Sequence, residues 1–121
     1  MADQLTDREA EIMRVLWERG PSSVAEVRTA LKSALAYTTV QTMLRILESK
    51  GFAAHEEQGR QHFFYPLIEE GAARKKAVKH LLTKLFRGSS ELLFTQLVSD
   101  QKLSPEQIRR MRKLLSEKEK E

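Results

Sequence analysis

Residues 36–52 read AYTTVQTMLRILESKGF and combine a helical repeat of apolar side chains with a stop signal. The apolar positions are spaced by three and four residues, which is the period of one helical face. We therefore expect a helix over about residues 38–50. Gly51 should end it, because glycine readily adopts the left-handed backbone found at helix C-termini. The core-facing side of this helix should consist of Val40, Met43, Leu44 and Leu47.

The other side of this helix is polar and carries no carboxylate before Glu48. Glutamine can pair with adenine, arginine can bind guanine through two hydrogen bonds, and a threonine methyl can contact a thymine methyl. A polar face is also what an ordinary helix presents to water, so the neighbouring elements decide between the two interpretations. The candidates for contact with DNA bases are Thr38, Thr39, Gln41, Thr42 and Arg45.

Two further helices are expected before this segment. The spacing of a capping box occurs at Thr6 with Glu9 and again at Ser23 with Glu26. The first helix should stop at Gly20-Pro21, and the second should continue to about residues 33–35.

A change to a β-type pattern follows the polar helix. Residues 52–57 and 60–65 favour two short strands around a turn at Gln58-Gly59, closed by Pro66. Three helices followed by a hairpin are typical of a winged helix-turn-helix. We therefore predict a fold that is mainly α with a small β-hairpin, and a DNA-binding domain over residues 1–68.

Three more side chains are candidates for contact with the DNA backbone. Arg60 at the hairpin tip could reach a flanking phosphate or the minor groove, or it could be a solvated turn residue. Tyr37 could contact a phosphate or sugar, or it could pack its ring across the turn before the helix. Lys50 could contact a phosphate, or it could stabilise the C-terminal end of the helix without DNA.

Residues 69–121 return to a helical repeat, and three helices are expected, the last two beginning after Ser89 and Ser104. Their leucine-rich faces are too broad for so few elements to cover, and large apolar patches usually mark contacts. We expect a helical dimerisation domain here, with packing against the first domain as the alternative. The side chains expected in the dimer interface are Leu81, Leu82, Leu85, Leu92, Leu93, Leu97, Ile108, Met111 and Leu115.

The charge of the 121-residue chain is unevenly distributed. Its net charge is +4, but residues 1–66 carry 8 Lys and Arg against 9 Asp and Glu, whereas residues 67–121 carry 13 against 8. The proposed DNA-reading half is therefore nearly neutral. This balance keeps open an alternative function, a winged-helix module that binds another protein without sequence-specific DNA binding.

Other classes of protein are disfavoured by the composition. The chain contains no cysteine, which excludes disulfides and thiolate chemistry. No apolar run could span a bilayer and the first residues do not resemble a signal sequence, so we expect a cytoplasmic protein without a membrane partner.

Neither an enzyme nor a metalloprotein is expected. No glycine-rich phosphate loop, nucleophile elbow or catalytic pair of carboxylates is present. His55, Glu56, Glu57 and His62 occur together on the predicted hairpin, but their spacing matches no metal-site signature. We therefore predict no catalytic residue, no cofactor and no metal ligand.

Several of these segments resemble the penicillinase-repressor family, the BlaI, MecI and CopY type. The resemblance covers about residues 5–117 and is most specific at Ala36-Tyr37-Thr38-Thr39-Val40. The first helix, with Ile12-Met13 and Leu16-Trp17, and the later Leu103-Ser104-Pro105-Glu106 also fit. The resemblance implies a homodimeric repressor that places two winged helices on a palindromic operator of double-stranded DNA and blocks transcription.

The chain departs from the family pattern at places that concern recognition and regulation. Ile46 stands where relatives often carry a basic residue, a role that Arg45 could take over. Members controlled by a membrane sensor are cut at an Asn-Phe bond, whereas the corresponding residues here are Gln96-Leu97. Copper-responsive members use a C-terminal cysteine cluster, which this chain lacks. The sequence therefore predicts neither the operator nor the inducing signal, and it identifies no inactivating protease.

Overall fold

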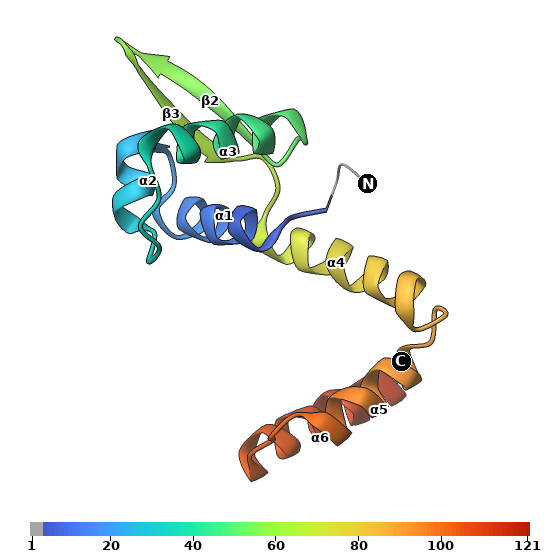
Figure 1. Cartoon of the computed structure of the whole chain (residues 1–121). Coiled ribbons are helices and arrows are strands. Elements are labelled where there is room, and N and C mark those ends of the chain that lie inside the picture. The colour runs from blue at the N-terminus through green and yellow to red at the C-terminus, as the bar shows by residue number, and fades with distance from the viewer. Residues whose placement is uncertain (1–3) are drawn as a thin grey trace. The chain divides into compact units, whose positions relative to one another are not determined.

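The structure is a computed structural model that describes residues 4–121. The chain forms two compact units, the first ending at Ala77 and the second beginning at Val78 (Figure 1). The boundary between the units lies within one helix, α4 (Glu70–Leu85). The division of function after residue 68 stays a prediction.

Helix α1 (Asp7–Arg19) begins at the predicted capping box. The hydroxyl of Thr6 accepts a hydrogen bond from the Glu9 N–H at 3.2 Å, and the Glu9 carboxylate accepts one from the Thr6 N–H at 2.9 Å. Gly20 ends the helix with φ +81°, a left-handed backbone that favours glycine.

Helix α2 (Val24–Ala30) begins at the second predicted box, at Ser23 and Glu26. Its predicted end at residues 33–35 is wrong, because Leu31 already has the extended backbone angles φ −69° and ψ 139°. Leu31 and Leu35 both pack against the core from this irregular segment. Tertiary packing therefore shortens the helix relative to its local pattern.

Helix α3 (Tyr37–Ser49) starts one residue before the predicted position. Three of its four predicted core residues, Val40, Leu44 and Leu47, are fully buried, and the fourth, Met43, packs partly buried against them. Gly51 has φ +86°, which confirms the predicted glycine stop. The burial of one side fixes which residues of α3 face outward.

The hairpin belongs to a three-stranded antiparallel sheet with the order β1-β3-β2. Strands β2 (Ala53–Gln58) and β3 (Gln61–Pro66) form the hairpin, and β1 (Ser22–Ser23) pairs with β3. The two-residue β1 was not predicted, because so short a segment has no pattern of its own. The predicted turn is displaced by one residue: Gln58 pairs with Gln61, so the turn is Gly59-Arg60.

The core of the first unit lies between α1, α2, α3 and the sheet. The indole N–H of Trp17 donates a 2.8 Å hydrogen bond to the carbonyl of Ile68, which holds the segment after β3 against α1. The buried apolar residues are Ile12, Met13, Val15, Leu16, Val24, Val27, Val40, Leu44, Leu47, Phe52, Ala53 and Phe64.

The second unit contains the end of α4 with α5 (Ser90–Asp100) and α6 (Pro105–Glu119). The predicted caps are confirmed, since Ser89 caps α5 and Ser104 forms a capping box with Gln107. None of these three helices contains a buried residue. Within residues 4–121, no helix is long and apolar enough to cross a membrane.

Candidate nucleic-acid interface

The outward face of α3 carries most of the predicted base-reading side chains. Since the buried residues of α3 occupy one side, Thr38, Thr39, Thr42 and Arg45 are exposed on the other, and Gln41 is half-buried. Tyr37 at the first position of the helix is 45% exposed, so its ring is not sequestered in the turn.

A pocket of about 130 Å³ joins α3 to the tip of the hairpin. Tyr37, Gln41 and Arg45 line it from α3, and Arg60 lines it from the turn between β2 and β3. Its remaining walls are the start of α2 and three residues of β3, and no carboxylate is among the lining groups. The remaining lining residues are Ser23, Val24, Ala25, Gln61, His62 and Phe64.

The structure therefore brings together four sequence-predicted residues that lie up to 23 positions apart, from Tyr37 to Arg60. Ser23 and His62, which share the same pocket, were not predicted as part of it. The alternation of side chains along β3 could have revealed His62, because it places this residue on the same strand face as the buried Phe64.

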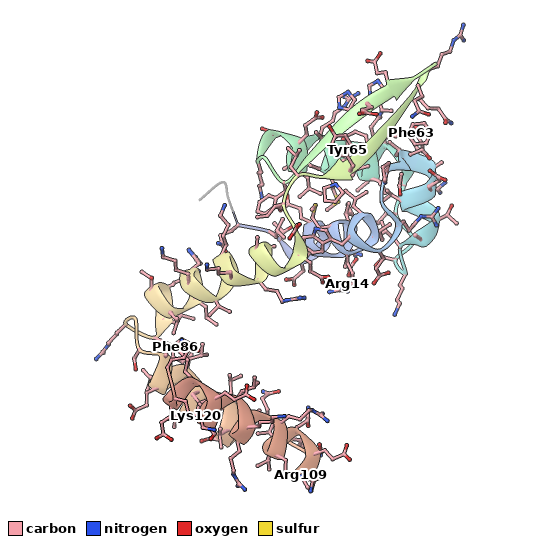
Figure 2. The ribbon with its side chains drawn as sticks, turned by 180° about the vertical axis from the view of Figure 1, so that it is seen from behind. Arg14, Phe63, Tyr65, Phe86, Arg109 and Lys120 are labelled. Atoms are coloured by element: carbon pink, nitrogen blue, oxygen red, sulfur yellow. The ribbon has the colours of Figure 1, made fainter. Side chains whose placement is uncertain are left out.

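The two faces of the hairpin differ in their surroundings. Phe64 is buried toward the helices, whereas Phe63 and Tyr65 alternate with it and lie on the opposite face (Figure 2). Glu56 pairs with Phe63 and shares that outer face, whereas Glu57 pairs with His62 on the side of α3. Only one of the two hairpin glutamates therefore lies on the face that carries the pocket.

Lys50 is placed differently from the other predicted DNA contacts. Its ammonium nitrogen lies 2.7 Å from the Glu9 carboxylate and 2.8 Å from the carbonyl oxygen of Gln4, and its side chain is only 17% exposed. Burial of the Glu9 carboxyl raises its pKa, but hydrogen bonds from Lys50 and Thr6 outweigh this effect and hold the pKa below its usual value. The geometry gives Lys50 a structural partner, and its contact with DNA stays a prediction.

Other acidic groups of the first unit also have partners within the chain. Glu48 and Glu57 lie 2.8 Å and 3.3 Å from histidine nitrogens, and Glu26 lies 3.5 Å from an Arg19 nitrogen. The hydrogen bond from the Ser23 backbone is the main reason why the pKa of Glu26 is lowered. Among the described residues, neither Arg45 nor Arg60 makes an ion pair. Although residues 1–66 are nearly neutral overall, Arg45 and Arg60 lie on one surface without an ion-pair partner within residues 4–121.

The pattern of the penicillinase repressor family matches residues 5–117. The chain is 28% identical to the penicillinase repressor of Bacillus licheniformis over 116 residues, which cover 94% of this chain and 91% of the relative. It is 23% identical to the methicillin resistance regulatory protein MecI of Staphylococcus aureus over 117 residues, or 95% of each chain.

Among solved structures, the DNA-binding domain of the repressor BlaI matches with a TM-score of 0.53 and 34% identity. This match covers 60% of the present chain and 90% of the BlaI domain. The likeness confirms the predicted winged-helix fold class. With the family pattern extending over nearly all described residues, the chain belongs to the penicillinase repressor family.

Proposed function

We propose that this protein is a sequence-specific DNA-binding transcriptional repressor. The observation that carries the proposal is the surface on which the outward residues of α3 meet Arg60 of the hairpin, lined by two arginines and no carboxylate. Such a surface attracts the phosphate backbone and offers donors and acceptors to base edges. The proposal includes no enzymatic activity.

The side chains of this surface divide into two tasks. Arg45 and Gln41 project from α3, the element that enters the major groove in helix-turn-helix proteins, so they read base edges together with the exposed threonines 38, 39 and 42. Arg60 at the hairpin tip and Tyr37 at the start of α3 contact phosphates or sugars beside the site. The first task gives specificity and the second gives affinity.

We infer that the repressor is a homodimer held together by the helices after residue 68. An apolar groove of about 430 Å³ runs between α5 and α6, and Leu92, Leu97 and Leu115 on these helices are 47%, 45% and 52% exposed. A second copy would bring an identical apolar surface, as a two-fold interface requires. The residues that line the groove are Phe94, Val98, Gln101, Leu103, Ile108, Met111, Arg112 and Leu115.

Two-fold symmetry has a consequence for the DNA site. Two copies of α3 related by a two-fold axis match a palindromic operator whose half-sites lie one or more helical turns apart. A dimer bound to such an operator within a promoter blocks transcription by occupying the DNA. Residues 1–68 would read the operator, and residues 69–121 would join the subunits.

A selection experiment tests the proposal without knowledge of the operator. The full chain selects duplexes from a random pool, and fluorescence anisotropy then compares a selected duplex with a scrambled one at several salt concentrations. We expect the selected duplex to bind at least about 1,000-fold more tightly, with affinity falling steeply as salt rises. Failure to bind any duplex in low salt would contradict the proposal and leave the protein-interaction alternative.

A further inference from the structure

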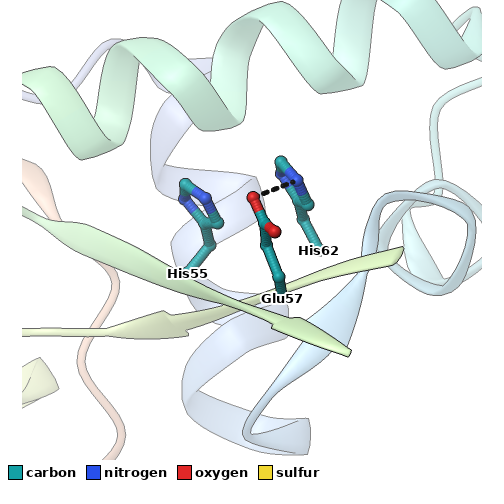
Figure 3. Close-up of side chains that lie close together, drawn as sticks. All are labelled: His55, Glu57 and His62. Carbon is teal, nitrogen blue, oxygen red and sulfur yellow. Dashed lines mark ion pairs between the residues drawn. The ribbon is translucent and has the colours of Figure 1, made fainter. Parts of the chain in front are cut away.

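Three metal-ligating side chains gather on the face of the hairpin that lies toward α3. His55 and Glu57 are two residues apart on β2, so they share a face of the strand, and His62 is the direct partner of Glu57 on β3. One potential ligand atom from each residue lies within 4.8 Å of the others (Figure 3). The strand register brings these residues together, which explains why their spacing in the sequence matches no metal-site signature.

Glu48 of α3 orients the first of the two histidines. Nδ1 of His55 lies 2.8 Å from each carboxylate oxygen of Glu48. Because an ionised carboxylate can only accept a hydrogen bond, Nδ1 donates in this pair, and in the neutral imidazole the lone pair that can bind a metal is then on Nε2. A carboxylate behind a histidine ring is the usual partner of a metal-binding imidazole, since it fixes the tautomer and the ring orientation.

The second histidine is held close to the first. The rings of His55 and His62 are stacked with centroids 4.4 Å apart and an angle of 11° between their planes. Nε2 of His62 lies 3.3 Å from the Glu57 carboxylate. The side chains are partly open to solvent, at 27% for His55, 40% for His62 and 68% for Glu57, so an ion from solution can reach them.

We propose that His55, Glu57 and His62 bind a divalent transition-metal ion of the zinc type, with Glu48 as a positioning residue. Two imidazoles and one carboxylate suit Zn²⁺, whereas Mg²⁺ and Ca²⁺ prefer oxygen ligands alone. Water fills the fourth position of a tetrahedral site.

Metal binding requires at least one of the two imidazole rings to turn out of the stack, because the in-plane lone pairs of nearly parallel rings do not converge on one ion. Tetrahedral bonds of about 2.0–2.1 Å place neighbouring ligand atoms roughly 3.4 Å apart, compared with the present limit of 4.8 Å. Rotations of the side chains close this gap, and the ion replaces the contact between Glu57 and His62. The backbone of the hairpin keeps its register.

The site also has a consequence for DNA binding, which rests on the proposed function. His62 lines the same pocket as Arg45 and Arg60. A bound ion adds positive charge beside these arginines and neutralises Glu57, the acidic group on this face of the hairpin. Zinc is therefore expected to tighten duplex binding.

The metal site is tested on the full chain in the absence of DNA. ZnCl₂ is titrated into metal-free protein by calorimetry, and the histidine ring signals are followed by NMR. We expect one ion per chain, with shifts at His55 and His62 but not at His80, the third histidine of the chain, which lies in α4. No binding up to about 100 μM zinc, or equal shifts at all three histidines, would overturn the proposal.

Four variants sharpen this test. His62→Gln and Glu57→Gln should each weaken zinc binding by about 10-fold or more, because each removes a ligand, and Glu57 is exposed enough for its substitution to preserve the fold. Glu48→Gln should weaken it by about 10-fold through the orientation of His55. His80→Gln is the matched control and should bind as the unchanged protein does. Equal loss in His62→Gln and His80→Gln would refute the assignment.

Duplex binding separates the two proposals. Absence of duplex binding both in metal-free protein and at saturating zinc would overturn the proposed function and leave the zinc site standing. Absence of zinc binding would overturn the site and leave the repressor function standing.

Discussion

The two units of this chain have similar apolar patterns in their sequences but bury them very differently. In the first unit, α1 and α3 each contribute at least three fully buried apolar side chains to one core. In the second, α5 and α6 contain no buried residue, although leucines recur along both. A helical repeat of apolar residues therefore predicts that a helix forms, but it does not identify which part of the molecule, or which other molecule, packs against the apolar face. The first unit has its own core, whereas the apolar residues of the second are those that we propose a second copy covers.

The largest effect is expected where the first unit is most densely packed. Leu16→Ala removes a side chain that is 0% exposed and should lower the free energy of unfolding by roughly 2–5 kcal/mol, since it leaves a cavity. Leu67→Ala is the matched control, because Leu67 is 57% exposed. Urea unfolding measures both variants. Similar losses in the two would show that this unit lacks the compact core described above.

Substitutions in the second unit should change the dimer dissociation constant rather than the packing of a core within one chain. Ile108→Glu places a charge in the apolar groove of both copies, so the dimer dissociation constant should rise by roughly 100-fold. Arg110→Gln changes the net charge by the same amount at a residue whose side chain is 69% exposed and lies outside the groove. Sedimentation equilibrium measures both constants. An unchanged constant for Ile108→Glu would place the interface elsewhere.

The ion pair between Lys50 and Glu9 tests whether Lys50 serves the first unit or the DNA. Lys50→Met leaves the buried Glu9 carboxylate without its partner and should cost about 2 kcal/mol of unfolding free energy. Arg8→Met breaks an exposed pair with Glu11 and should cost less than about 0.5 kcal/mol. If Lys50→Met left the stability unchanged and made duplex binding less dependent on salt, Lys50 would instead be assigned to a contact with a DNA phosphate.

The same pair has a defined pH dependence. The pKa of Glu9 is held below the ordinary value of 4.5 in the folded protein, so this group stabilises the fold above that value. Its contribution is lost as the pH falls through the lowered pKa. The stability difference between the unchanged protein and Lys50→Met should therefore shrink on acidification below about pH 4.5, as chemical unfolding at several pH values would show. A difference that grew on acidification would contradict this assignment.

The smallest effects distinguish the two arginines of the surface that we propose faces DNA. Arg45→Ala should cost roughly 1–3 kcal/mol on a selected duplex and much less on a scrambled one, because a base contact is lost. Arg60→Ala should weaken both duplexes alike, and by less. Fluorescence anisotropy in the same buffer gives the four values. Equal discrimination in both variants would refute this division between specificity and affinity.

Local signals were sufficient for most helix starts in both units. The three capping boxes depend on residues three positions apart, and each forms as predicted. The errors arose where distant contacts decide the outcome. Leu31 leaves the helical conformation while packing against the core, and β1 exists only because Ser22 and Ser23 pair with β3.

In the candidate site too, features set by local periodicity could be predicted from the sequence, whereas contacts between distant residues could not. Helical periodicity placed Thr42 and Arg45 on the outward side of α3, since it required only the identity of the buried residues. The pairing of Lys50 with Glu9 joins residues 41 positions apart, and no pattern in the sequence encodes it. The histidine cluster depends on the pairing of two strands, which places His62 opposite Glu57, and the spacing of these residues in the sequence matches no metal-site signature.

The central claim is that one unit reads DNA while the other joins two copies, and the mass of the complex tests it most directly. Light scattering coupled to size-exclusion chromatography would measure the full chain alone and with one selected duplex. We predict two chains in the free protein and two chains on each duplex. A single chain in both states would contradict the account.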